Sequence, residues 1–184
     1  MMKKIIAFLA CVLLMTACSK DSTISHDYRC FFVFDTSLHP LPCQLTGIVG
    51  NNGLFMKVEM SQRQGVVHLH TTRNYDNAVD DVRLSTAKEN QVNYSLGANN
   101  CIIIGTSSYD FVLTCFDGQC ANCMENDGGT NYPLTWTNSG LRLYCAKCKR
   151  SYDVNNGVVA DGEPGRQLYR YQAALDGAVL RAWN

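Results

Sequence analysis

Two pairs of cysteines have the spacing of a metal site. Cys120 and Cys123 form one Cys-x2-Cys pair, Cys145 and Cys148 form a second, and 21 residues separate the pairs. Each pair can present two thiolates from one tight turn, and two such turns brought together make a tetrahedral cage. The spacing predicts a four-cysteine metal site. It leaves open whether the site transfers electrons, stabilises the fold or is oxidised to disulfides.

The first residues read as a targeting segment. Residues 1–4 are basic and residues 5–14 are apolar but too few to span a bilayer, and small residues precede Cys18. This resembles a bacterial lipoprotein signal, although Met15 stands where such signals usually have Leu. The resemblance implies removal of residues 1–17, a lipidated Cys18 that anchors the protein to a membrane, and residues 18–26 as a lipidated cysteine and polar tether. The alternative is a plain secretory peptide in which Cys18 is incidental.

Residues 27–184 have the length of one domain. Sixteen basic residues balance sixteen acidic ones without a basic segment, so we expect no nucleic-acid partner. A lipidated, exported chain would lie in the bacterial cell envelope, on the periplasmic or outer-membrane side, where disulfides persist. The cysteines outside the two pairs are therefore disulfide candidates, and the pairing of Cys30 and Cys43 stays open.

The remaining pattern predicts an all-β domain with antiparallel strands. Short runs rich in β-branched and aromatic residues alternate with Gly, Asn, Asp and Ser. We expect one short helix, residues 77–89. The predicted strands are 28–34, 54–58, 66–71, 91–95, 101–105, 111–116, 141–144, 167–174 and 178–182.

Two hairpins can be placed. If residues 101–105 and 111–115 pair symmetrically about Ser108, Cys101 lies opposite Cys115 at a distance that a disulfide can span. The alternative is that both are small buried hydrophobic residues. The second predicted hairpin covers residues 168–182 and turns at Asp176-Gly177, a strong hairpin signal.

The second half of the chain resembles Rieske-type iron–sulfur domains. The likeness runs through the strand that starts at Cys101, the strand 111–117 and the first pair, then through the second pair, Ser151-Tyr152-Asp153-Val154, Gly157 and a closing hairpin. It covers residues 99–184 and implies a Rieske-like antiparallel β domain with two metal-ligand loops. It also implies that the Tyr152 hydroxyl donates a hydrogen bond close to the metal ligands.

The sequence departs from that family at the ligands. Rieske sites use two histidines and two cysteines, whereas here Cys148 stands at the second histidine position and Cys123 follows the first, where Asn122 sits. All four ligands become thiolates. Lys149 also replaces a usual Gly, and Arg150 stands where some members place a hydroxyl.

Three states of the four cysteines compete. Zinc matches four thiolates and contributes folding free energy. A 2Fe–2S cluster would have a low potential, about −400 mV, but folded export normally needs an Arg-Arg signal that residues 1–4 lack. Disulfides within each pair would be strained. We rank zinc first, disulfides or an empty site second and the cluster third.

Other chemistry has less support. His68 and His70 alternate on a predicted strand, as ligands could, but we interpret them as a solvated face. Asp80-Asp81 fits a helix start better than a catalytic pair. Neither cysteine pair is expected to open a helix, which disfavours thioredoxin chemistry. We expect no enzyme, because no nucleophile, phosphate loop or positioned acid and base is evident.

These expectations combine into one functional hypothesis. The chain is a lipid-anchored envelope protein whose four-cysteine site is a structural zinc site, and it binds an unknown envelope protein. The alternative is a 2Fe–2S electron-transfer protein with an electron-transfer partner.

Overall fold

The computed structural model describes residues 24–184. Within them, thirteen strands form two antiparallel sheets, one of nine strands and one of four. This confirms the predicted all-β class. The predicted signal peptide, residues 1–17, and Cys18 lie outside the described residues.

The larger sheet contains the first and the last strand of the described residues, and its strand order is β4-β3-β2-β6-β7-β12-β13-β1-β5. Its strands are β1 (Cys30–Asp35), β2 (Phe55–Arg63), β3 (Val66–Arg73), β4 (Val79–Leu84), β5 (Ser95–Leu96), β6 (Cys101–Thr106), β7 (Leu113–Asp117), β12 (Arg170–Asp176) and β13 (Val179–Trp183).

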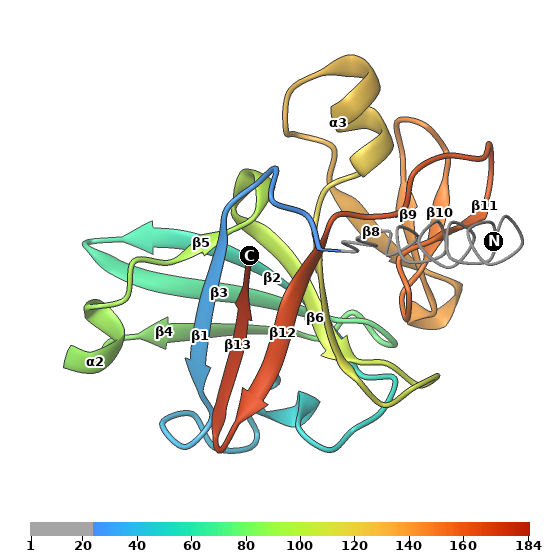
Figure 1. The fold of residues 1–184 in the computed structure, drawn as a ribbon. Helices are drawn as coiled ribbons and strands as arrows, with labels where there is room; N and C mark the ends of the chain where they lie inside the picture. Colours follow the sequence, from blue (N-terminus) through green and yellow to red (C-terminus); the bar gives the residue numbers. More distant parts are fainter. Residues whose placement is uncertain (1–23) are drawn as a thin grey trace, which may run out of the picture.

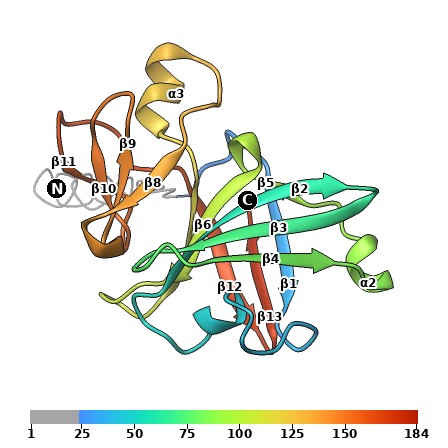
Figure 2. The same cartoon turned by 180° about the vertical axis from the view of Figure 1, so that it is seen from behind.

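This nine-stranded sheet folds back on itself to enclose a core. In Figure 1, β1, β13 and β12 cross in front of β2, β3 and β4, and Figure 2 shows the same two layers from behind. Buried side chains from both layers meet between them, among them Phe32, Leu69 and Leu180. Burial of apolar side chains between the layers is the main stabilising contribution to this part of the molecule.

Two tight turns explain the register of two hairpins in this sheet. Gln64 and Gly65 join β2 to β3 and both have positive φ, 53° and 78°, as a type I′ turn requires. The predicted hairpin at Asp176-Gly177 is confirmed: Asp176 pairs with Val179, and Gly177 takes φ 59° at the first loop position.

The smaller sheet packs on the outer face of the larger one. It comprises β8 (Leu134–Thr137), β9 (Arg142–Cys145), β10 (Ser151–Asp153) and β11 (Val159–Asp161), in the order β11-β10-β9-β8. Strand β6 is buried on both faces because Ile102 and Ile104 face the first core while Ile103 faces the small sheet. This accounts for its uninterrupted apolar run.

The short helices lie in the connections. They are α2 (Ala87–Asn90) and α3 (Ala121–Asp127), with 3-10 turns η1 (Thr46–Ile48), η2 (Ala98–Asn100) and η3 (Asn138–Gly140). Helix α2 starts with a capping box, in which the Thr86 side chain accepts from Glu89 N and Glu89 accepts from Thr86 N.

The predicted helix over residues 77–89 is wrong. Residues 79–84 form β4, and only the end of the segment is helical. Val82 and Leu84 are buried with exposed residues between them, a period of two that belongs to a strand. Asp81 lies within β4 and does not start a helix. Its carboxylate forms ion pairs with His68 and Arg63. The predicted strand 91–95 shrinks to β5, which pairs only with the start of β1.

The predicted register of β6 and β7 is also wrong, and with it the placing of Cys101 opposite Cys115. Ile104 faces Cys115, and the hairpin loop runs from Ser107 to Val112. Within the loop Ser107 N donates to Val112 O, which moves the turn away from Ser108. Cys101 lies instead beside Gly118, where a Cβ atom would be 2.1 Å from the Cys101 Sγ.

Polar side chains connect the two sheets. Asn74 is buried, accepts a hydrogen bond from Phe55 N at 3.2 Å and donates to Gly140 O at 3.2 Å. The Trp136 indole N–H of β8 donates to Thr72 O of β3 at 3.1 Å. These contacts hold the small sheet, and the loops at its end, in a defined position.

Candidate metal centre

The four predicted ligands come from two connections at one end of the small sheet. Cys120 and Cys123 lie in the segment that leaves β7, Cys145 is the last residue of β9, and Cys148 lies between β9 and β10. The second loop is closed by two backbone hydrogen bonds, Lys149 N to Cys145 O and Cys145 N to Arg150 O, each 2.9 Å. Lys149 has φ 63°, the left-handed conformation that glycine favours.

The structure brings these four sulfur atoms together. All four Sγ atoms lie within 4.8 Å of one another. Cys120 Sγ is 3.6 Å from Cys148 Sγ, and Cys123 Sγ is 3.7 Å from Cys145 Sγ. A Zn–S bond of about 2.3 Å implies a tetrahedral edge of about 3.8 Å. The donor set therefore fits one tetrahedral metal ion.

Burial differs among the four thiols. Cys120, Cys123 and Cys145 are buried, whereas Cys148 is half-buried at the rim. Burial raises the pKa of Cys120 to about 11 and raises the pKa of Cys123 still further. At Cys148 burial acts in the same direction, but hydrogen bonds from the Arg150 backbone and guanidinium outweigh it and lower the pKa to about 7.

A buried tyrosine supports the first ligand. The Tyr152 hydroxyl lies 3.0 Å from Cys120 Sγ, and the side chain is fully buried in β10. A metal-bound thiolate carries no proton, so the hydroxyl must donate in that state. Tyr152 thus lies in hydrogen-bond contact with one of the four candidate ligands.

Basic side chains surround the exposed rim. Lys147 and Lys149 are exposed on either side of Cys148, and neither forms an ion pair with a described residue. The Arg150 guanidinium donates to the carbonyl oxygens of Glu163 and Pro164, at 2.8 and 3.3 Å. A divalent ion with four thiolates has a net charge of −2, which these cations offset.

The prediction that neither cysteine pair opens a helix is wrong for the first pair, whereas the second pair leads into β10 as expected. Cys120 is the N-cap of α3, and Cys123 lies in its first turn. The signal was hidden because the helix ends after seven residues at Gly128, within the polar run that reads as a loop. Burial keeps the pKa of Cys120 high despite this position, unlike the lowered pKa of a redox-active thioredoxin thiol.

The remaining cysteines form no disulfide in the described chain. Cys30, Cys101 and Cys115 are buried free thiols, and Cys43 is a half-buried one. Cys101 and Cys115 sit as small apolar residues within the larger sheet, which is the alternative considered from the sequence.

The two strand histidines do not join the metal site. His68 and His70 lie on β3, and His68 Nδ1 is 2.8 Å from Asp81 Oδ1. This contact lowers the pKa of Asp81.

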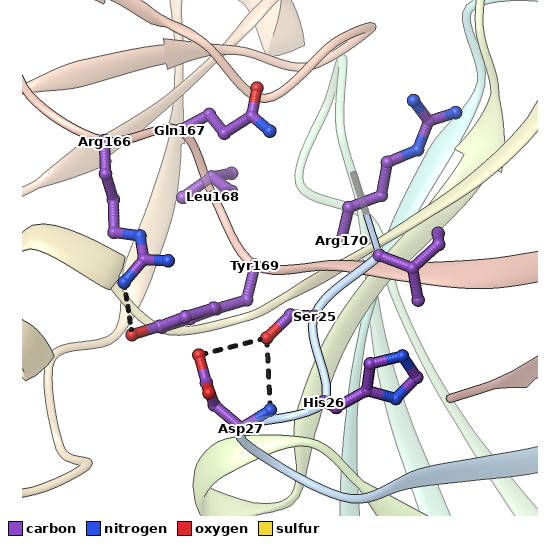
Figure 3. Close-up of a pocket in the computed structure, with 9 residues that line it drawn as sticks. Ser25, His26, Asp27, Arg166, Gln167, Leu168, Tyr169 and Arg170 are labelled. Carbon is purple, nitrogen blue, oxygen red and sulfur yellow. Dashed lines mark hydrogen bonds between the residues drawn. The ribbon is translucent and has the colours of Figure 1, made fainter. Parts of the chain in front are cut away.

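A polar depression of about 310 Å³ lies between residues 24–27 and 166–170 (Figure 3). Its charged groups do not converge. Arg166 stacks over the Tyr169 ring at 4.6 Å and donates to the Tyr169 hydroxyl at 3.2 Å, while Asp27 bonds to Ser25. Figure 3 shows the Arg170 guanidinium turned away from Arg166. The depression therefore offers no cluster of groups aimed at one ligand atom.

Sequence reasoning missed two residues at the metal centre, Asn122 and Arg166. Asn122 is buried beside the ligands, and its side chain bonds to both backbone groups of Arg166. No local signal could have identified this pair, because the two residue numbers differ by 44.

Among the described residues, none belongs to a helix long and apolar enough to cross a membrane. Comparison of the chain with protein-family models, with curated proteins and with solved structures finds no match.

Proposed function

We propose that this chain is an exported, lipid-anchored binding protein of the bacterial cell envelope whose four cysteines hold one structural zinc ion. The observation that carries the metal part is the tight sulfur cluster, with every Sγ within 4.8 Å of the others. Zinc would join the loop after β7 to the loop after β9, and so would stabilise the small sheet.

The spacing favours one ion over two. In a 2Fe–2S cluster the thiolates bind as two pairs on different irons, and the bridging sulfides hold those pairs apart. Here every Sγ lies within 4.8 Å of all three others, so no two pairs are held apart and the four ligands fit one shared ion. The cluster remains the alternative function, as an electron carrier, and the half-buried Cys148 would be its point of contact with a partner.

The Rieske-like assignment is part of the proposal. Support comes from the chain order, in which β6 and β7 precede the first ligand loop, β9 and β10 flank the second, and the hairpin β12–β13 closes the domain. The position of Tyr152 against Cys120 is consistent with it.

Metal analysis combined with a visible spectrum tests the metal assignment. The protein should be isolated without air from the membrane of its own host. We expect one zinc per chain and no visible absorption. Two irons and two labile sulfides per chain would reject the zinc assignment and support the 2Fe–2S cluster. One iron without sulfide would give a single-iron electron carrier, and metal-free protein with oxidised cysteines would reject the metal site.

Lipid labelling tests the anchor separately. Cys18→Ser with residues 1–17 intact should abolish labelling and release the protein from membranes, because Cys18 is the residue placed for acylation. Cys43→Ser is a matched control and should leave labelling unchanged. Membrane attachment of the Cys18 variant without a lipid label would contradict the proposal.

A further inference from the structure

The buried amide of Asn122 has only one orientation that satisfies its neighbours. Asn122 is 4% exposed. Its Oδ1 accepts from Arg166 N at 3.0 Å, and its Nδ2 donates to Arg166 O at 2.8 Å. A backbone N–H can only donate and a carbonyl can only accept, so Arg166 fixes which end of the amide is oxygen and which is nitrogen.

That orientation leaves one amide proton pointing at Tyr152. Asn122 Nδ2 lies 2.8 Å from the Tyr152 hydroxyl oxygen and donates to it. The hydroxyl oxygen accepts this bond, so its own single proton is free to be donated. The other group within reach is Cys120 Sγ, at 3.0 Å. Tyr152 is fully buried, so bulk water does not compete. The hydrogen bonds therefore run in one direction, from the Arg166 backbone through Asn122 and Tyr152 to Cys120.

The loop that carries Arg166 is shaped for this contact. A Cβ atom at Gly165 would lie 2.2 Å from Asn122 Oδ1, so only glycine allows the loop to come so close. The contact joins α3, β10 and the segment before β12, three elements that do not pair with one another.

We propose that Asn122 is a positioning residue for the metal centre: it directs the Tyr152 proton onto the Cys120 thiolate and thereby strengthens metal binding. The inference rests on the proposed metal site and adds a requirement that the four cysteines alone do not meet. A hydrogen bond to a metal-bound thiolate stabilises the negative charge on its sulfur. Loss of such a partner typically costs about 10- to 100-fold in metal affinity.

Asn122→Asp tests the direction of the hydrogen bond, because it keeps the shape but replaces Nδ2, which donates to both the Tyr152 hydroxyl and Arg166 O, by an acceptor oxygen. The remaining carboxylate oxygen can still accept from Arg166 N, but the oxygen facing Tyr152 attracts the phenol proton away from Cys120. Zinc affinity by chelator competition should fall by about tenfold or more. In the Co²⁺-loaded protein the sulfur-to-metal charge-transfer band should move to lower energy, as it should in Tyr152→Phe. In the Tyr152→Phe background, Asn122→Asp should move the band no further.

Asn126→Asp is the matched control, since it adds the same charge to an exposed position of the same helix. It should leave both the band and the zinc affinity at the wild-type values. If Asn122→Asp does not fold, Asn122→Ser removes the amide without adding charge and should move the band in the same direction.

Three outcomes would overturn the inference in distinguishable ways. A wild-type band in Asn122→Asp together with a shifted band in Tyr152→Phe would show that Asn122 does not direct the proton. Wild-type behaviour of Tyr152→Phe would show that the hydroxyl does not act on the metal centre. A wild-type protein that binds neither Zn²⁺ nor Co²⁺ would remove the metal site itself and the proposed function with it.

Discussion

The two sheets of this protein are stabilised in different ways. The nine-stranded sheet encloses its own core, with Phe32 and Leu69 fully buried between its two layers. Among the described residues, the four-stranded sheet has no separate core of its own, because its buried apolar cluster includes Phe55, Ile103 and Phe116 of the larger sheet. Three of the four ligand cysteines are also buried in this cluster. A sheet this small buries too little apolar surface of its own, so a metal cross-link has more to contribute there.

Removing one metal ligand should produce the largest difference in stability between the two sheets. Cys145→Ser should lose most of the metal's folding contribution, which reaches about 10 kcal/mol in small zinc domains. Hydrogen exchange should show β9 and β10 unprotected while β2 and β3 keep their protection. Excess chelator should reproduce this in the wild type.

The four ligands should also act as one unit. Cys120→Ser combined with Cys145→Ser should cost little more stability than either change alone, because one missing ligand already loses the metal. Cys43→Ser, outside the cluster, serves as the control in thermal melts. Additive losses that are insensitive to chelator would point to disulfides rather than metal.

A cavity in the larger core should give the opposite pattern. Phe32→Ala removes a fully buried ring and should cost about 3–5 kcal/mol of unfolding free energy, whether or not metal is bound. Phe31→Ala is the control on the same strand, where the ring is 40% exposed, and it should cost much less. A change in zinc affinity in Phe32→Ala would mean that the two regions are more tightly coupled than we infer.

Asp117 lies where β7 passes into the first ligand loop, and it should make stability depend on pH. Burial raises its pKa to about 6, while hydrogen bonds from Tyr171, Ala98 N and Gln119 N act in the opposite direction. The folded state therefore favours the protonated acid. The associated stability is fully present below the unfolded pKa of 3.8 and is lost as the pH rises through about 6.

Asp117→Asn should remove this pH dependence. The stability advantage of the wild type over Asn should shrink by up to about 3 kcal/mol between pH 4 and pH 7.5, from two pKa units at about 1.4 kcal/mol each. Chemical denaturation at both pH values, with saturating zinc, measures the difference. A constant difference would show that Asp117 keeps an ordinary pKa.

The smallest effect is expected at the contact between the sheets. Asn74→Ala leaves Phe55 N and the carbonyl oxygens of Gly53 and Gly140 without their partner, which should cost about 1–3 kcal/mol. Asn90→Ala, at an exposed position in α2, should change the unfolding free energy much less. Equal losses in the two variants would argue that Asn74 does not join the sheets.

Local patterns predicted most of the strands and one turn. Alternating or continuous apolar runs identified β2, β3, β6 and β13, and Asp176-Gly177 identified its hairpin, because both signals depend on neighbours in sequence. The same reasoning failed at residues 79–84, where acidic residues suggested a helix but pairing with β3 buries Val82 and Leu84 in a strand. It also missed α3, which is short and anchored by tertiary contacts.

The sequence by itself determined which residues can bind a metal, since two Cys-x2-Cys pairs set the spacing of the thiols within each tight turn. Only the tertiary structure decided how the pairs meet, with Cys120 against Cys148 and Cys123 against Cys145. It likewise decided that Cys101 and Cys115 do not face each other, because a loop conformation moves the register. The bond between Asn122 and Arg166 depends on the packing of α3 against a loop 44 residues away, and sequence spacing carries no information about such a contact.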